Sequence, residues 1–319
     1  MRHHIPLVAL TIAGASFAVT EAAEDSVRIA KWQNDRAGAF AFTFDDGQRE
    51  QAAIAAPMLD ALGLKATFVI NPGKTPQNGE SWFGSWEQWR ALAKNGHEIG
   101  NHAMTHENLS KASDEVLQRE VVDAKALIEK EMALPCYTFV YPFSAEGDAA
   151  RALVKKTHPV WSSGERKAYG GPNFTAAKAN AWIDEAIAQK SLVIAMIHGI
   201  DTGYLPFTGR AIFKDHLDYV KSKESQVWVA TLATIKRYAA ERDAAKLDVQ
   251  TIAKKMVITL TCTLDPAIYN VPLTVVIASG GAKTVTAKRS SGEVTATISG
   301  DHILCEIVPG AEAVTVTWK

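Results

Sequence analysis

Short apolar runs alternate with helix-spaced apolar positions along most of the chain. The apolar runs predict seven strands, at residues 40–44, 66–70, 97–102, 137–143, 160–163, 192–198 and 227–231. Apolar residues at helical spacing between them predict helices at residues 48–62, 86–95, 113–130, 179–189 and 211–222. Strand followed by helix, repeated, favours a parallel sheet or barrel, which holds its functional residues at the carboxyl ends of its strands.

The last part of the chain has a different pattern. After a helix predicted from residue 231 to about 247, Thr, Val and Ile become more frequent, and short runs alternate between apolar and polar positions. Six strands are predicted there, at residues 255–263, 273–278, 284–288, 294–298, 302–308 and 313–318. They would suit a small all-β sandwich of immunoglobulin-like type. We expect it to pack against the preceding domain, with glycan binding through Trp318 or His302 as the alternative.

The N-terminus is typical of an export signal. Arg2 and two histidines precede an apolar stretch, residues 5–19, that is too short to span a bilayer. Cleavage is expected after Ala18 or near Ala23, and no other stretch reaches the roughly 18 unbroken apolar residues of a membrane helix. We therefore predict a secreted or periplasmic protein with a signal peptide at 1–23, a catalytic domain at 24–248 and a β-sandwich domain at 249–319.

Composition narrows the choice of partners. The chain has 319 residues, 47% hydrophobic and 22% charged, which is ordinary for a globular protein of more than one domain. A formal net charge of −1 without a basic stripe excludes nucleic acid as an expected partner. The three cysteines lack the spacing of a structural zinc site, and export permits a disulfide between Cys262 and Cys305.

Metal-ligand residue types follow two of the predicted strands. Thr43-Phe44-Asp45-Asp46-Gly47 ends one strand, and Asn101-His102-Ala103-Met104-Thr105-His106 ends another. A catalytic metal site uses about three protein ligands and leaves one position open, which Asp46, His102 and His106 would satisfy. Asp45, beside the metal but not on it, would then be a general base.

Each motif alone is more common in ordinary turns or among solvated histidines than in a catalytic site. A third feature changes this interpretation, because the apolar strand predicted at 192–198 ends in His198 and Gly199. Three such strand ends in one parallel sheet favour a composite site at one edge.

With these motifs in this order, residues 37–238 resemble the polysaccharide deacetylases with a NodB-like domain, also called carbohydrate esterase family four. The resemblance implies a distorted (β/α) barrel of about seven strands. It also implies Asp45 as base, Asp46, His102 and His106 as metal ligands, and His198 as general acid. Phe139-Val140-Tyr141-Pro142-Phe143 resembles a third motif, which makes the backbone N–H of Phe143 the oxyanion donor.

The chain departs from the family in two places. Many members carry an arginine in the third motif that holds the catalytic aspartate, and none is present here. Either the chain functions without it, or a residue such as Arg166 or Arg210 replaces it from another loop. The fourth motif, with a tryptophan that supports the acid histidine, leaves Trp161 and Trp182 as candidates.

Three functions remain open. The first is a secreted metal-dependent deacetylase of an N- or O-acetylated polysaccharide or oligosaccharide, with Zn²⁺ expected and Co²⁺ or Ni²⁺ as alternatives. The others are a C–N hydrolase acting on a small amide and a catalytically silent glycan-binding protein. Tyr204, Trp82 and Tyr141 are the expected substrate contacts, since aromatic faces stack on sugar rings. His97 and His216 are expected to be structural.

Overall fold

The computed structural model of the protein describes residues 27–319 apart from 80, 208, 253 and 254. The predicted signal peptide at 1–23 lies outside these residues. Within the described part, no helix combines the length and the apolar character that a membrane span requires.

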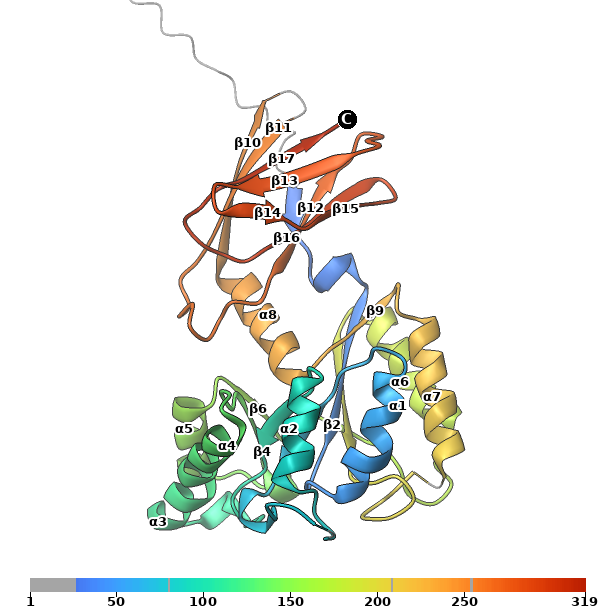
Figure 1. Cartoon of the computed structure of the whole chain (residues 1–319), viewed down its shortest axis with the longest axis vertical. Coiled ribbons are helices and arrows are strands. Elements are labelled where there is room, and N and C mark those ends of the chain that lie inside the picture. The colour runs from blue at the N-terminus through green and yellow to red at the C-terminus, as the bar shows by residue number, and fades with distance from the viewer. Residues whose placement is uncertain (1–26, 80, 208, 253–254) are drawn as a thin grey trace, which may run out of the picture.

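A sheet of eight parallel strands forms the centre of the larger domain (Figure 1). Its order is β6-β5-β4-β3-β2-β8-β7, and β9 also pairs with β2. The strands are β2 (Gly38–Phe44), β3 (Thr67–Ile70), β4 (Glu98–Asn101), β5 (Thr138–Val140), β6 (Val160–Ser162), β7 (Lys167–Ala168), β8 (Leu192–Ile197) and β9 (Val227–Val229). No pairing joins β6 to β7 among the described residues, so the barrel is open there. The predicted α/β class and distorted barrel are confirmed.

The central strand β2 is buried on both faces. Its phenylalanines, Phe40, Phe42 and Phe44, belong to the core that packs under the helices, whereas Ala39 and Ala41 belong to the core shared with the smaller domain. Alternate residues of a strand point to opposite faces, so one short run of sequence supplies both cores.

Helices lie around the sheet (Figure 1). They are α1 (Ala56–Asp60), α2 (Trp86–Lys94), α3 (Asp114–Leu117), α4 (Ala124–Met132), α5 (Asp148–Thr157), α6 (Ala176–Ala188), α7 (Arg210–Ser222) and α8 (Leu232–Ala244). The sequence pattern missed α5, which buries only Ala150 and Val154 and so presents a thin apolar stripe. It also extended the last helix to about residue 247, whereas α8 ends at Ala244.

The smaller domain consists of two antiparallel sheets, as predicted for the β-rich region. One has the order β1-β12-β16-β15, and the other β10-β11-β17-β13-β14. The strands are β1 (Val27–Ile29), β10 (Ala245–Ile252), β11 (Lys255–Cys262), β12 (Leu273–Ala278), β13 (Val285–Arg289), β14 (Gly292–Val294), β15 (Ala296–Ser299), β16 (His302–Ile307) and β17 (Val314–Trp318).

Two features of this domain were not foreseen. Strand β1 comes from the beginning of the described chain and pairs with β12, Val27 opposite Ile277. Strand β10 begins at Ala245, directly after α8. The chain division expected at 248/249 stays a prediction. Cys262 and Cys305 are both free, so the disulfide that export would permit is not formed.

The smaller domain packs on the amino ends of the barrel strands, and α8 connects the two domains (Figure 1). The Tyr238 hydroxyl of α8 donates to the carbonyl oxygen of Ala30 at 2.9 Å. The Glu241 carboxylate accepts from the Val271 N–H at 2.9 Å. Because both contacts cross between the domains, α8 holds them in one packed unit.

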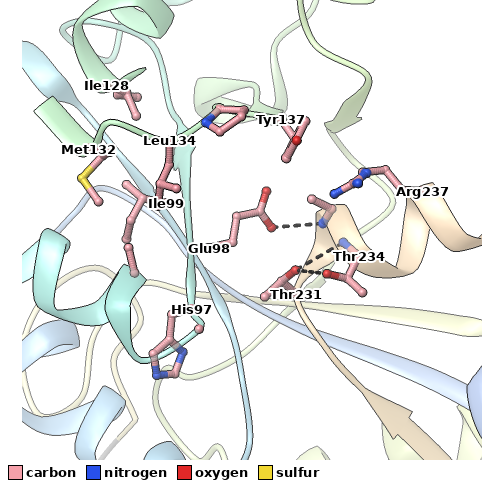
Figure 2. A pocket seen from close by; sticks show the side chains of 14 residues that line it. His97, Glu98, Ile99, Ile128, Met132, Leu134, Tyr137, Thr231, Thr234 and Arg237 are labelled. Atoms are coloured by element: carbon pink, nitrogen blue, oxygen red, sulfur yellow. Dashed lines mark hydrogen bonds between the residues drawn. The ribbon is translucent and has the colours of Figure 1, made fainter. Parts of the chain in front are cut away.

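A hollow of about 330 Å³ lies near the start of α8, at the amino end of β4 (Figure 2). Its central carboxylate, Glu98, accepts from the Ala233 N–H at 3.0 Å and from the Thr67 hydroxyl at 2.7 Å. The Thr138 hydroxyl also donates to it. Burial raises the pKa of Glu98, and these donors oppose the rise. Glu98 therefore fastens the first turn of α8 to the sheet.

Two buried histidines have structural partners, as expected. His97 Nδ1 accepts from the Ala66 N–H at 3.1 Å. His216 lies against the rings of Phe40 and Phe42, and its nitrogens contact the Tyr169 hydroxyl at 3.1 Å and Asn180 Oδ1 at 2.8 Å. Burial lowers the pKa of His216 to about 3, so its ring is neutral in the folded protein at neutral pH.

We expect the His216→Gln variant to lose less stability than the wild type as the pH falls. The unfolded chain takes up a proton at this histidine below about pH 6.5, and the folded protein does so only near pH 3, so its contribution is complete above pH 6.5 and is lost as the pH falls. His216 should contribute about 1.4 kcal/mol per pH unit to the slope of the free energy of unfolding against pH. Denaturant unfolding followed by circular dichroism between pH 7 and 4 measures it.

The exposed His302 supplies the matched control, since His302→Gln should leave the slope unchanged. Equal slopes for wild type and His216→Gln would contradict the assignment.

Candidate metal centre and active site

The acidic pair lies where β2 ends. The Asp45 N–H still donates to the Ile197 carbonyl of β8 at 2.8 Å, and the chain then turns through positive φ at Asp46 (72°) and Gly47 (65°). A Cβ on residue 47 would come within 3.1 Å of the Ile70 side chain, and its φ is positive, so this position favours glycine. The turn sends the two carboxylates in different directions.

Both predicted histidine ligands lie near Asp46. His102 follows β4, and His106 lies four residues later in a loop with positive φ at Ala103 and His106. Asp46 Oδ1 is 3.5 Å from His102 Nε2 and 3.2 Å from His106 Nε2. The candidate ligand atoms of the three residues all lie within 4.8 Å of one another.

Polar residues that sequence reasoning did not single out hold this loop in place. Glu120 is fully buried and accepts from the Thr105 N–H and from the Thr105 hydroxyl, both at 2.8 Å. The Asn71 amide donates to the carbonyl oxygens of His102 and Ala103. The sequence did not point to Glu120 or Asn71, because an isolated Glu in a helix or Asn after a strand is usually exposed.

The hydrogen bond of His102 indicates which kind of ligand the cluster can bind. Its Nδ1 lies 2.8 Å from the Val140 carbonyl oxygen, so the neutral ring carries its proton there and turns the Nε2 lone pair toward Asp46. Asp46 Oδ1 is buried and has no hydrogen-bond donor among the described residues. Burial would raise the pKa of Asp46, but positive charge on the two nearby imidazoles, when they are protonated, outweighs burial and holds that pKa well below its ordinary value. The donor set suits a divalent cation.

Asp45 has a different environment. Arg166 Nη1 donates to both of its carboxylate oxygens at 2.7 Å, and both side chains are almost fully buried. Asp45 Oδ2 is 4.0 Å from His102 Nε2, farther than Asp46. The alternative left open by the sequence is therefore resolved: Arg166 takes the position beside the aspartate, while Arg210 pairs with Asp201 at 2.8 Å.

Arg166 lies on the segment that joins β6 to β7, where the barrel is open. Glu165 accepts from the Ser162 hydroxyl at 2.7 Å and from the Ser163 N–H at 2.8 Å. Burial raises the pKa of Glu165, but these hydrogen bonds outweigh it and lower the pKa to about 2. Lys236 of α8 donates to Glu165 at 3.3 Å. Helix α8 therefore helps to hold the segment that carries Arg166 in place.

His198 follows β8 and faces the same hollow. Gln51, another residue that the motifs did not indicate, donates to its carbonyl oxygen at 2.7 Å and also to the carbonyl oxygen of Asp45. His198 Nδ1 is buried without a hydrogen-bond partner among the described residues. Burial lowers the pKa of His198, and the Asp45 and Asp46 carboxylates oppose this effect.

Neither candidate tryptophan supports His198. Trp182 stacks on Tyr169 with ring centroids 4.5 Å apart, and Trp161 lies under the Lys155 ammonium.

The third motif supplies one wall of the hollow. Phe143 has φ 57° and a side chain that is 67% exposed, with its ring edge-on to His106 at 4.5 Å. Its N–H donates to no backbone carbonyl of the described residues. Tyr141, in contrast, is fully buried against Phe139, so the structure does not bring its side chain to the hollow.

These residues enclose a hollow of about 540 Å³ at the carboxyl ends of the strands. It is lined by Asp45, Asp46, His102, His106, Phe143, Ser144, Arg166, Met196, His198 and Tyr204. Tyr204 is 64% exposed and lies edge-on to His198 at 5.0 Å. Trp82 does not line this hollow.

Comparisons with known proteins identify several relatives of this chain. A sequence model of the family described as polysaccharide deacetylase matches residues 33–158. The chain is 34% identical over 98 residues to a peptidoglycan-N-acetylglucosamine deacetylase from Bacillus cereus, covering 30% of this chain and 42% of that protein. It is 27% identical over 286 residues to a gellan lyase from a Bacillus species, covering 77% of this chain and 11% of that protein. The chain therefore spans less than half the length of either curated relative.

A similar solved structure is a family 4 acetyl xylan esterase from Clostridium thermocellum in complex with a cobalt ion. It is 22% identical with a TM-score of 0.47, covering 62% of this chain and 89% of that chain.

We expect Arg166→Met to destabilise the fold by about 3 to 5 kcal/mol, because it leaves the buried Asp45 carboxylate without a counter-charge. Arg210→Met, which removes an exposed arginine from its pair with Asp201, should cost under about 1 kcal/mol. Urea unfolding of both variants measures the difference. Equal losses in the free energy of unfolding would show that the buried pair stabilises the fold no more than the exposed pair does.

Proposed function

Because this chain carries a domain of the polysaccharide deacetylase family, matched over residues 33–158, we propose that it hydrolyses acetyl groups from an acetylated polysaccharide or oligosaccharide. From the predicted signal peptide we infer that the reaction occurs outside the cytoplasm, in the periplasm or the medium.

One observation carries the proposal: three ligand atoms converge beside a second carboxylate that is held away from them. Asp46, His102 and His106 form the converging set, and Asp45 is engaged by Arg166. An ordinary ion pair or turn does not require this separation of two adjacent carboxylates. A metal-dependent hydrolase does, because one carboxylate must bind the ion and the other must accept a proton.

The cluster fits a divalent ion bound by one carboxylate and two imidazoles. Zn²⁺ is the expected ion, with Co²⁺ or Ni²⁺ as alternatives, since nitrogen and oxygen donors suit all three. When bound, such an ion polarises the acetyl carbonyl and acidifies the attacking water.

The protein's own residues perform the proton transfers. Asp45 takes the proton from the attacking water, and Arg166 fixes the direction of its carboxylate through two hydrogen bonds. The Phe143 N–H, which has no backbone acceptor among the described residues, donates to the oxygen that becomes negative, a contact of about 3 kcal/mol in comparable sites. His198 donates a proton to the departing amine or hydroxyl group.

None of the described residues of the smaller domain lines the catalytic hollow. It packs on the amino ends of the strands, at the opposite end of the barrel from the catalytic hollow. His302 and Trp318, the side chains in which sequence suggested sugar contacts, belong to β16 and β17 of that domain. The amino end of such a barrel ordinarily contributes to stability.

Acetate release tests the proposal. The protein is stripped of metal, reloaded with Zn²⁺ or Co²⁺, and incubated with N-acetylated and O-acetylated glycans and with small acetamides. Metal-dependent release from a glycan is the expected result. Release from small amides alone would favour a C–N hydrolase, and glycan binding without release would favour a silent binding protein.

We expect Asp46→Asn and Asp45→Asn to fail in different ways. Asp46→Asn removes a ligand, so the variant should lose its metal equivalent, measured by mass spectrometry after dialysis, and its activity with it. Asp45→Asn should retain the metal and lose turnover by about a hundredfold or more. Melting curves confirm that each variant is folded at the assay temperature. Loss of metal from Asp45→Asn would contradict the division of roles.

A further inference from the structure

The hollow at the amino ends of β4 and β5 lies at the opposite end of the strands from the catalytic hollow (Figure 2). Its volume of about 330 Å³ is within the range in which proteins bind small molecules. Helices α2 and α4, strand β4, the connection from α4 to β5 and the start of α8 line it. The proposed reaction uses none of these lining residues, so the hollow is open to a separate role.

One wall of the hollow is apolar. It consists of Ile99 from β4, Ile128 and Met132 from α4, and Leu134 and Pro135 from the connection that follows α4. Leu134 is 52% exposed, whereas Ile99 and Ile128 are buried. A ligand with an apolar group would remove the exposed surface of Leu134 from water, which favours binding.

The Glu98 carboxylate can accept one further hydrogen bond. Its Oε2 accepts from the Thr67 hydroxyl and the Ala233 N–H, whereas its Oε1 accepts only from the Thr138 hydroxyl. A carboxylate has about four acceptor positions, so one remains on Oε1. Burial raises the pKa of Glu98, but the three donors and the Arg237 charge oppose the rise. The carboxylate can therefore bind a ligand group that donates, above all a positive one.

Arg237 is the positive group of the hollow. It is 8% exposed, and its guanidinium lies over the Tyr137 ring, 4.4 Å from the ring centroid. Its Nη2 donates to Asn270 Oδ1 at 2.5 Å, and its Nε has no partner among the described residues. Its charge opposes the rise in pKa that burial causes at Glu98 and Glu241, but it donates to neither carboxylate. An arginine this deeply buried is ordinarily paired with an acid.

Opposite charges therefore line one hollow without meeting. In the view of Figure 2, Glu98 lies between Arg237 on one side and Ile99 and Leu134 on the other. A charge away from bulk water is most stable beside an opposite charge at hydrogen-bond distance, and neither group has the other as that partner. A zwitterion supplies both partners, because its positive group can donate to Glu98 while its negative group accepts from Arg237. An α-amino acid with an apolar side chain also supplies a group for the apolar wall.

We propose that this hollow binds a free α-amino acid with an apolar side chain, such as leucine or methionine. The ammonium group of the ligand donates to Glu98 Oε1, its carboxylate accepts from the Arg237 guanidinium, and its side chain covers Leu134. The inference does not depend on the proposed deacetylation, because it concerns residues at the other end of the barrel.

A series of ligands tests the proposal on the unaltered protein. Leucine is titrated calorimetrically beside three analogues that each lack one group: isocaproate lacks the ammonium, isoamylamine lacks the carboxylate, and glycine lacks the apolar side chain. Leucine should bind, and each analogue should bind at least about tenfold more weakly, because each loses one charge-assisted hydrogen bond or the apolar contact. N-acetyl-leucine amide, which resembles a peptide segment and carries no charge, should also bind at least about tenfold more weakly.

Variants then locate the bound ligand. Leu134→Ala should weaken leucine binding about fivefold, through loss of apolar contact. Ile252→Ala, which truncates an exposed aliphatic side chain of β10 in the smaller domain, is the matched control and should bind leucine as the wild type does. Arg237→Gln should bind leucine and isoamylamine equally, because the partner of the ligand carboxylate is gone. Melting curves check that each variant is folded, and if Arg237→Gln is not, the ligand series and Leu134→Ala decide.

Three results would each overturn the inference. The first is no binding of leucine or methionine at millimolar concentration. The second is leucine binding that Leu134→Ala leaves unchanged, since the ligand would then lie elsewhere. The third is equal binding of leucine and any of isocaproate, isoamylamine or N-acetyl-leucine amide, which would show that the two charges of the hollow do not recognise a zwitterion. Acetate release enters none of these measurements, so the proposed function and this site can fail separately.

Discussion

The buried ion pair between Asp45 and Arg166 is the contact on which the rest of the catalytic end depends. Both side chains are almost fully buried, and a charge in that position is tolerated only beside an opposite charge with good hydrogen bonds. The pair therefore requires the segment between β6 and β7 to cross the open side of the barrel at Arg166. It also occupies both oxygens of Asp45, which leaves Asp46, on the other side of a left-handed turn, to face the two histidines.

The two ends of the barrel have different roles. At the carboxyl ends, loops with several positive-φ residues hold ionisable side chains around an open hollow, and exposed aromatic rings surround it. At the amino ends, the smaller domain covers the strands, and Glu98 fastens the first turn of α8 to them. Lys236 connects these ends, because it extends from α8 to Glu165, next to Arg166. Contacts of α8 at the amino ends thus help to position Arg166 at the carboxyl ends.

Much of the candidate site could be predicted because its parts are local. An apolar run that ends in Asp45 and Asp46, and another that ends near His102, place those residues at strand ends whatever the rest of the chain does. Elements with weak or distant signals were missed. Helix α5 buries two residues, and β1 is a three-residue strand whose partner β12 lies about 250 residues away in sequence. No local pattern records a pairing of that kind.

The sequence by itself determined the residue types of the site, their order, and the alternation of strands and helices that brings them to one edge. It left open which arginine reaches Asp45, whether Tyr141 faces the hollow, and how Trp82 relates to the catalytic turn. Tertiary structure decided these points: Arg166 crosses where the sheet fails to close, Tyr141 turns into the core, and Trp82 pairs with Arg49. The reason is physical, since periodicity reports which face of its own element a residue occupies, whereas contacts between elements depend on how those elements pack.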